Sequence, residues 1–486
     1  MTSSSVITFV CVCVCLCSVS DCHFEELGVA SELGYKTKEN KLDHSVRSSE
    51  EHSSQQPPPQ PQDSLLQPNR LLAAVTFCKS KIQGALNNTI TRMLCVRAFL
   101  LVSLSVAALC SLQDRQTDFG LRVFSQMAEG AAASRGENLA FSPHGVATLL
   151  GMVQLGAGGS TRKALRSAMG FSLQERGLSR QQRRLQQSLS AAGGLETSSA
   201  VMVERLLGLE AGFRRALLKA FRTAPHQVDF SRAEQATDVI NAWVSDRTAG
   251  MIPQFLAPGT LTDETRLVLL NALHFQGLWK VPFDPKLTQE RMFHCANGSS
   301  VPVAMMRLTA AFRYGEFVSS DGLEYLVVEV PYEGDALSMF LVQPFEVDVP
   351  AGALAAELSS QRIGQWSAEL RSVKRRLALP RFSIDSEVNL KAVLTNMGLG
   401  EMFNLATADF SRITTEERLS VSAVLQRVKI EVNEEGTKAA AASGAIMFSR
   451  MGVEEIALDT PFLFLIQHKA TGAVLFMGQV NQPAPY

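Results

Sequence analysis

Cysteine is scarce in most of this chain. Eight of the nine cysteines lie within residues 1–112, and Cys295 is the only one in the remaining residues up to 486. This long part therefore cannot form an internal disulfide and must be held together by an apolar core. Because 46% of all residues are apolar, such a core is available, and a wholly disordered chain is excluded.

The chain also lacks an excess of charge of either sign. Lysine and arginine number 46 against 47 aspartates and glutamates, which gives a formal net charge of −1. Domains that bind nucleic acids usually carry a basic excess. We therefore do not expect a nucleic acid as a partner.

Catalytic motifs are missing after residue 112. No GxSxG elbow, HExxH, phosphate-binding P-loop or CxxC pair occurs there. The glycines of residues 156–159 follow an expected helix instead of a strand, so they predict the end of that helix and no dinucleotide site. The histidines are scattered without metal-ligand spacing: His144, His226, His274, His294 and His468. We expect neither an enzyme nor a bound metal or cofactor.

A secretory signal peptide is predicted at residues 93–111. Arg97 precedes an apolar run at residues 98–109, which small residues follow, and this run is too short to span a bilayer comfortably. An earlier apolar run, at residues 6–19, has no lysine or arginine before it. We expect a secreted protein whose globular domain occupies residues 112–486.

Residues 1–92 are expected to be an upstream extension. A signal that begins at Met93 cannot direct a ribosome-bound chain whose first 92 residues are already made, so we expect translation to start at Met93. The sequence QQPPPQPQ at residues 55–62 cannot build a core and should be disordered. The alternative is a genuine long N-terminus with an internal anchor.

Apolar periodicity predicts helices first and strands later in the globular part. Helical spacing occurs in residues 119–127, 146–155, 236–244 and 390–399. Ser231 and Glu234 predict a capping box before the third of these helices. Strands are predicted at residues 266–274, 325–331, 337–342, 377–382 and 461–467. This order favours an α+β domain over alternating βαβ units.

Residues 433–452 form an unusual segment, NEEGTKAAAASGAIMFSRMG, between two strand-like runs. Its first half consists of small residues without an apolar face. A structureless insert of this length in a compact domain is usually functional or disordered. From local propensity alone, an alanine-rich helix or a linker is an equal alternative.

The segment resembles the reactive-centre loop of the serpins, and motifs along the whole globular part resemble serpin motifs. Glu434-Glu435-Gly436-Thr437, followed by Ala439, Ala440, Ala441 and Ala442, is similar to the loop hinge. Further matches are Phe141-Ser142-Pro143, Asn241-x-Trp243-Val244, Asn271-Ala272-Leu273-x-Phe275-x-Gly277-x-Trp279, Leu379-Pro380-x-Phe382, Asp459-Thr460-Pro461-Phe462-Leu463-Phe464 and Gly478-Gln479-Val480. Thr460 departs from the basic residue or serine usual at its position.

This resemblance implies the serpin fold and its mechanism. We expect a monomer with a large central β-sheet, second and third sheets, about nine helices and an exposed reactive-centre loop. A protease attacks the loop of such an inhibitor, and the cut loop then enters the central sheet as a new strand. Within the family, Gln227-Val228-Asp229-Phe230 and Phe476-Met477-Gly478-Gln479-Val480 are most similar to the inhibitors of plasminogen activators.

Arg450-Met451 is the expected scissile bond. A trypsin-like protease carries an acidic residue in its primary pocket and requires arginine or lysine there. Arg450 is the only basic residue between Lys438 and His468. In an extended strand, one face would carry residues that are all small except the last: Thr437, Ala439, Ala441, Ser443, Ala445 and Met447. No proline interrupts residues 433–452, so every backbone N–H can join a ladder.

The resemblance also implies the target proteases. Tissue-type and urokinase-type plasminogen activators are expected, and Glu454 and Glu455 would meet a basic loop on them; two solvated carboxylates are the alternative. Gln426 stands where most serpins have histidine, as in a family member that becomes latent by inserting its uncut loop, so we expect latency here. Another Arg-specific protease such as thrombin is an alternative target. A non-inhibitory carrier is the alternative function. The small residues 439–442 argue against it, because bulky or charged hinge residues would block insertion of the loop.

Three accessory features complete the expectations. Arg176, Arg180, Arg183 and Arg184 are a candidate heparin site or a solvated face. Arg205 and Arg222 match part of a vitronectin-binding region by resemblance, but Arg214, Arg215 and Leu218 replace its anchors. Asn297-Gly298-Ser299 is a glycosylation sequon.

Overall fold

The computed structural model describes residues 111–128, 136–191, 195–275, 277–347, 349–436 and 453–483. The chain divides into two units, Met1–Ser105 and Val106–Tyr486, and all described residues lie in the second. Among them, no helix has the length and apolar character needed to cross a membrane. The expected upstream extension lies outside the described residues, as does the predicted signal peptide apart from Ser111.

Most helices precede the main strands, as the sequence predicts. The first is α4 (Leu112–Ala128), in which Phe119, Val123 and Phe124 are fully buried. The others are α6 (Pro143–Gln154), α7 (Gly159–Met169), α8 (Leu178–Ser190), α9 (Ala211–Phe221), α10 (Ala233–Arg247), α11 (Ser360–Glu369) and the short α12 (Lys391–Leu394).

Two helix starts show how local sequence acts. Ser142 caps α6, because its Oγ accepts a hydrogen bond from Gly145 N at 3.0 Å and Pro143 occupies the first turn. The capping box predicted for α10 is wrong. Its N-cap is Arg232, which makes no side-chain cap bond, and the Ser231 hydroxyl instead donates to Asp229 Oδ1 at 2.5 Å. The nearby carboxylate takes the hydroxyl away from the helix end.

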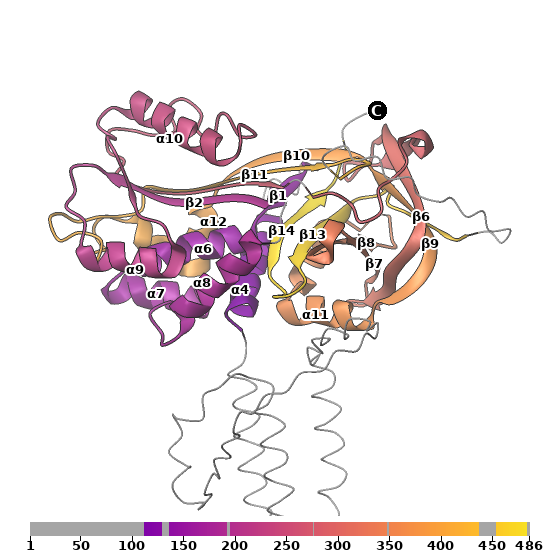
Figure 1. Ribbon diagram of the computed structural model, residues 1–486, viewed down its shortest axis with the longest axis horizontal. Helices are drawn as coiled ribbons and strands as arrows, with labels where there is room; N and C mark the ends of the chain where they lie inside the picture. Colours follow the sequence, from indigo (N-terminus) through magenta and orange to yellow (C-terminus); the bar gives the residue numbers. More distant parts are fainter. Residues whose placement is uncertain are drawn as a thin grey trace, which may run out of the picture. The chain divides into compact units, whose positions relative to one another are not determined.

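Five strands form one sheet, in the order β10 (Phe382–Asn389), β11 (Ala423–Val432), β4 (Leu267–Phe275), β2 (Leu195–Glu204) and β3 (His226–Val228). Strands β11 and β4 are parallel neighbours, with Gln426 opposite Asn271. In Figure 1, helices α6 to α9 lie on one side of this layer and α10 lies on the other. Cover on both faces explains why every residue of β4 is buried and why its sequence shows no alternation.

Nine strands form a second hydrogen-bonded sheet, which is called the nine-stranded path below. It runs β1 (Leu139–Phe141), β14 (Val474–Val480), β13 (Phe462–His468), β8 (Leu337–Pro344), β7 (Glu324–Pro331), β6 (Ser300–Val318), β9 (Arg371–Pro380) and β12 (Glu455–Ala457), with β5 (Gln289–His294) on β6. Strand β6 has 19 residues and pairs with β5 near its start and with β7 near its end. This long strand joins what the sequence predicts as separate second and third sheets.

Some predicted boundaries differ from the structure. The strand predicted at residues 377–382 is two strands, because β9 ends at Pro380 and β10 begins at Phe382. The helix predicted at residues 390–399 is α-helical only to Leu394, and Gly398 has a positive φ of 84°. Strand β2 was not predicted, since its buried Ala200–Val203 stretch carries no alternating pattern.

The core lies on both faces of the five-stranded sheet. One cluster packs Leu267 and Leu269 of β4 against α4 and α6. A second cluster joins Leu273 and Phe275, at the end of β4, to the nine-stranded path. A third packs Val268 and Leu270 under α10. The sheet that would have to open for loop insertion is therefore the centre of the packed unit.

Candidate functional site

The candidate site is the segment that leads from β11 to β12. The structure describes its two ends, up to Gly436 and from Val453 onward. Arg450 and Met451 lie outside the described residues, so the scissile bond remains a prediction. The same holds for five hinge residues, Thr437, Ala439, Ala440, Ala441 and Ala442.

Trp279 and Phe283 hold the backbone at the start of the segment. Trp279 Nε1 donates to Asn433 O at 2.9 Å, and Phe283 N donates to Glu434 O at 2.8 Å. Trp279 is itself buried and stacks on Tyr332 with the ring centroids 4.5 Å apart. The chain that leaves β11 is therefore held against the aromatic side chains of Trp279, Phe283 and Tyr332.

The side chain of Glu434 is locked in the same place. It is 4% exposed, and its Oε1 accepts hydrogen bonds from Arg381 Nη2 at 2.5 Å and Thr288 Oγ1 at 2.7 Å. Burial acts to raise the pKa of Glu434, but the hydrogen bonds from Arg381 and Thr288 outweigh it, so the pKa is lowered overall. The carboxylate stays ionised and ties β11 to the start of β10.

Gly436, the last described hinge residue, cannot be replaced without strain. Its φ is +97°, and an added Cβ would lie 2.1 Å from Gly277 O. Only glycine combines this backbone conformation with so close an approach. The position therefore requires the glycine that the hinge motif supplies.

The five-stranded sheet holds no strand between β4 and β11. These two strands pair directly from Ala423 opposite Val268 to Ile430 opposite Phe275. Because they run parallel, a segment that turns back after β11 would pair antiparallel with both of them.

A buried polar cluster around Gln426 links β11 to β4 and to the residue before α6. Gln426 is fully buried; its Oε1 accepts from Ser142 N at 2.8 Å, and its Nε2 donates to Asn271 Oδ1 at 2.7 Å. Gly145 leaves room for this contact, since a Cβ there would lie 2.0 Å from Asn271 Oδ1. Separating β4 from β11 requires the bond between Gln426 and Asn271 to break.

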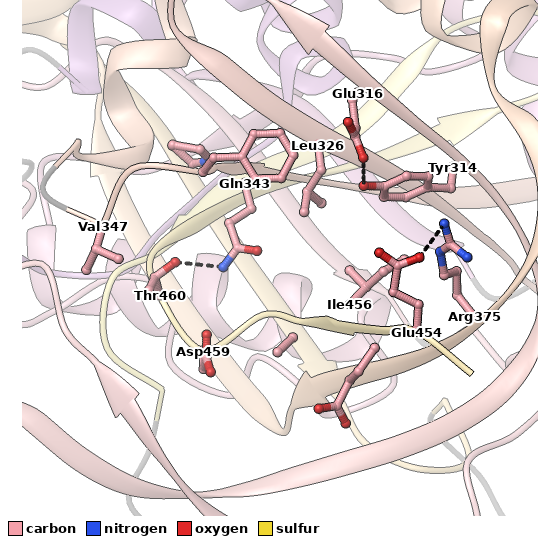
Figure 2. A pocket seen from close by; sticks show the side chains of 14 residues that line it. Tyr314, Glu316, Leu326, Gln343, Val347, Arg375, Glu454, Ile456, Asp459 and Thr460 are labelled. Carbon is pink, nitrogen blue, oxygen red and sulfur yellow. Dashed lines mark hydrogen bonds and ion pairs between the residues drawn. The ribbon is translucent and has the colours of Figure 1, made fainter. Parts of the chain in front are cut away.

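Glu454 and Glu455 lie at the other end of the segment. Figure 2 shows Glu454 directed toward Arg375, whose Nη2 lies 2.8 Å from Glu454 Oε2. Glu455 Oε2 lies 3.2 Å from Arg291 Nη1. Both carboxylates border a surface pocket, and each has an ion-pair partner within the chain.

The four candidate heparin arginines do not act alike. Arg176, Arg180 and Arg184 are exposed, and none takes part in an ion pair within the described part of the chain. Arg183 is half-buried, and its Nε donates to Lys219 O, near the end of α9, at 2.8 Å. Three of these residues are therefore available to a ligand, while the fourth joins two helices.

Asn297 sits in an exposed turn. Its Oδ1 accepts hydrogen bonds from Ser299 N at 3.0 Å and from Ser299 Oγ at 2.7 Å. Cys295, beside it, is buried and free. An exposed turn is the setting in which an N-linked sugar can be added.

Of the histidines named in the sequence, His144 is buried in the first turn of α6. Burial lowers the pKa of His144 to about 4, so it is neutral under the α6 cap. Among the described ranges, no group of three or more His, Cys, Asp and Glu could hold a metal ion.

Comparison with known proteins identifies the family. The profile described as "Serpin (serine protease inhibitor)" matches residues 114–483. The chain is a serpin. It is 45% identical over 370 residues to plasminogen activator inhibitor 1 of Neovison vison, which covers 76% of this chain and 92% of that protein. It is 36% identical over 396 residues to human glia-derived nexin, covering 79% and 98%.

A solved serpin structure agrees with this assignment. The "Crystal structure of native protease nexin-1 with heparin" superimposes with a TM-score of 0.72 at 35% identity, covering 77% of this chain and 99% of that one. The fold class predicted from the sequence is therefore confirmed. The serpin is an inhibitory protein related to these relatives and not an enzyme.

Sequence reasoning missed the residues that hold the ends of the loop. Arg381, Thr288 and Phe283 carry no signal in the sequence that links them to Glu434. Trp279 was named only as part of a family motif. Arg291 and Arg375 were not singled out, because a surface arginine becomes specific only through the partner that folding places beside it.

Proposed function

We propose that this serpin is a secreted inhibitor of trypsin-like serine proteases, above all of tissue-type and urokinase-type plasminogen activators. The observation that carries the proposal is Arg450, the only basic residue between Lys438 and His468, within the segment that joins β11 to β12. The acidic primary pocket of a trypsin-like protease requires such a residue. The relatives named plasminogen activator inhibitor 1 support the choice of target.

The inhibitory step is trapping of an acyl-enzyme. The protease serine attacks the Arg450 carbonyl, the Arg450–Met451 peptide bond breaks, and Arg450 becomes esterified to the serine. Residues 437–450 then enter between β4 and β11, antiparallel to both. Fourteen extended residues span roughly 46 Å, so the protease is carried across the domain before water can release it.

The composition of the loop suits this insertion. One face of the inserted strand would pack into the core, and all its residues except Met447 are small: Thr437, Ala439, Ala441, Ser443, Ala445 and Met447. Lys438 would point the other way and keep its charge in water. A carrier serpin has no need of such a hinge, whereas thrombin or another Arg-specific protease remains the alternative target, as the nexin relatives suggest.

Two further ligands, heparin and vitronectin, are proposed. Heparin fits the exposed Arg176, Arg180 and Arg184, and the nexin relative was crystallised with heparin. Vitronectin is proposed for the surface that includes Arg205 and Arg222, although Arg214, Arg215 and the exposed Leu218 replace the anchors of the resembled region. Arg205 is paired with Asp229 at 3.2 Å, so vitronectin would have to compete for it. Binding of purified vitronectin to the immobilised serpin, and its loss in Leu218→Glu, tests the second proposal.

Secretion and glycosylation are proposed together. The predicted signal at residues 93–111 would deliver the domain to the secretory pathway, where Asn297 would be modified. Expression from Met93 in cultured cells should release a product that an N-glycosidase shortens. A product that stays in the cells, or that Asn297→Gln does not change, would contradict this.

Covalent trapping is tested with urokinase-type activator. The serpin expressed from Met93 should give a band of the summed mass on a denaturing gel, with cleavage after Arg450. Arg450→Gln should give neither cleavage nor complex with a trypsin-like protease. Absence of any complex with the unchanged serpin would contradict the proposed target.

Thr437→Arg separates recognition from insertion. This variant should be cleaved at Arg450 without forming a stable complex, because a buried unpaired charge costs several kcal/mol during insertion. Lys438→Arg is the matched control, since its side chain would stay in water, and it should still inhibit. An unchanged stoichiometry for Thr437→Arg would refute the insertion step.

A further inference from the structure

Residues 251–256 connect α10 to β4 and are called the connecting segment below. Phe255 and Leu256 are buried in the third core cluster, which also contains Leu270 of β4 and Leu425 of β11. One cluster therefore links this segment to both strands between which the loop is proposed to enter. The segment belongs to the face of the five-stranded sheet on which α10 lies in Figure 1.

The connecting segment is fixed to α10. Asn241 Oδ1 accepts hydrogen bonds from Phe255 N at 2.9 Å and from Leu256 N at 2.7 Å, and Asn241 Nδ2 donates to Leu256 O at 3.0 Å. The same cluster joins α10 to β2 and β3, and the chain runs on from the segment into β4. The segment therefore belongs to the part of the sheet that contains β2, β3 and β4.

Arg427 connects this segment to the other part of the sheet. It lies on β11 opposite Ala272 of β4, on the same face as Leu425 two residues before it. Its Nη1 donates to Gln254 O. Its Nε donates to Asp385 Oδ1 of β10 at 2.8 Å, and its Nη2 donates to Asp385 Oδ2 at 2.9 Å. One guanidinium thus joins β10, β11 and the connecting segment.

The pair with Asp385 holds the guanidinium in place. Two parallel N–H···O bonds to one carboxylate fix both the direction and the rotation of the arginine fork. The Arg427 side chain is 22% exposed, so water screens these contacts only in part. Asp385 therefore positions the third donor, Nη1, which binds Gln254 O.

An added strand would break this connection. Neighbouring strands lie about 4.8 Å apart, so one more strand between β4 and β11 would move Arg427 away from Gln254 by about that distance. A hydrogen bond spans only about 3 Å between its heavy atoms. Arg427 must therefore release either Gln254 O or Asp385 before the two strands can separate.

We propose that Arg427 is a positioning residue that ties the connecting segment across the β4–β11 pairing, and that its release limits the rate at which the sheet opens. This inference rests on the proposed function, since it concerns insertion of the loop between these two strands. The bond to Gln254 O stabilises the closed sheet and is lost on opening, so it raises the barrier to insertion.

The test measures how fast the sheet takes up a strand. The intact serpin is incubated with a synthetic peptide of residues 437–450, and incorporation is followed on a native gel. Arg427→Met should incorporate the peptide about tenfold faster than the unchanged serpin, because the bond to Gln254 O no longer holds the sheet closed. Arg427→Lys keeps the charge but not the fork, and its rate should fall between the two.

Lys429→Met is the matched control. Lys429 lies on the same face of β11, two residues further on, and its Nζ lies 3.4 Å from Glu431 Oε1 of the same strand. Loss of this pair frees nothing across the β4–β11 pairing, so the incorporation rate should not change. Asp385→Asn should speed incorporation and add little to Arg427→Met, because both act through one guanidinium.

Each outcome decides the inference. Faster incorporation in Arg427→Met and Asp385→Asn, without a change in Lys429→Met, supports it. An unchanged or slower rate in Arg427→Met overturns it, as does an equal gain in Lys429→Met. Covalent trapping of urokinase-type activator by the unchanged serpin tests the proposed function separately. A serpin that traps the activator, while Arg427→Met takes up the peptide at the unchanged rate, refutes the role of Arg427 alone.

Discussion

At the scale of single residues, the start of the loop depends on close contacts that only certain side chains permit. Gly436 approaches Gly277 O so closely that a Cβ would lie 2.1 Å away, and its φ of +97° is unfavourable for any other residue. Glu434 is buried there with Arg381 and Thr288. These contacts hold the chain in place up to Gly436.

Replacement of Gly436 tests this contact. Gly436→Ala should lose about 1–3 kcal/mol, because the backbone is strained and the Cβ clashes with Gly277 O, which should lower the midpoint of thermal unfolding by a few degrees. Gly212→Ala, in the first turn of α9, is the control, since an added Cβ there meets nothing within 4 Å. An equal midpoint for both variants would contradict the argument.

At the scale of elements, α8 shows that a cluster read from sequence can contain different roles. Arg176, Arg180 and Arg184 face solvent, whereas Arg183 donates to Lys219 O and joins α8 to α9. The charge of all four is visible in the sequence. Which of them crosses to another helix depends on how α8 and α9 pack.

Replacing these arginines one at a time should affect heparin affinity differently. Arg180→Ala and Arg184→Ala should each weaken heparin affinity and lower the slope of log affinity against log salt by about one, as counterion release predicts. Arg183→Ala should instead lower thermal stability through the lost bond to Lys219 O. Arg232→Ala, at the start of α10, serves as the charge control. Equal heparin effects for Arg183 and Arg184 would contradict the division.

At the scale of the whole molecule, the proposed inhibition depends on the pairing of β4 with β11 in the five-stranded sheet. Strands β4 and β11 are parallel, directly paired and covered on both faces. A segment inserted between them would form two antiparallel ladders where one parallel ladder exists now. Under the proposed insertion, the five-stranded form would persist because opening the sheet is slow, and its lifetime would be a kinetic property.

The lifetime of the active form should depend on Gln426. Gln426→Leu leaves Ser142 N and Asn271 Oδ1 without their partner, and each buried unsatisfied group costs about 1–3 kcal/mol. Because β4 and β11 would separate more easily, inhibitory activity at 37 °C should decay about tenfold faster than in the unchanged serpin. Gln343→Leu, in the nine-stranded path, is the control. Decay at the same rate in Gln426→Leu and the unchanged serpin would refute the role of this cluster.

The amino-acid sequence alone was sufficient for the family, the order of helices and strands, and the candidate scissile bond. These depend on patterns within short stretches: apolar periodicity, the small residues 439–442, and a lone arginine at position 450. Local reasoning failed where a competing partner was nearby, as at Ser231, whose hydroxyl binds Asp229 instead of capping α10.

Only the tertiary structure decided how the ends of the loop are held. Arg381 reaches Glu434, Trp279 reaches Asn433, and Arg375 reaches Glu454, although each pair is far apart in the sequence. The same holds for the surroundings of Glu454 and Glu455, which have the same side chain but pair with different arginines. Composition and spacing carry no record of such contacts, because they arise when strands from distant parts of the chain pack together.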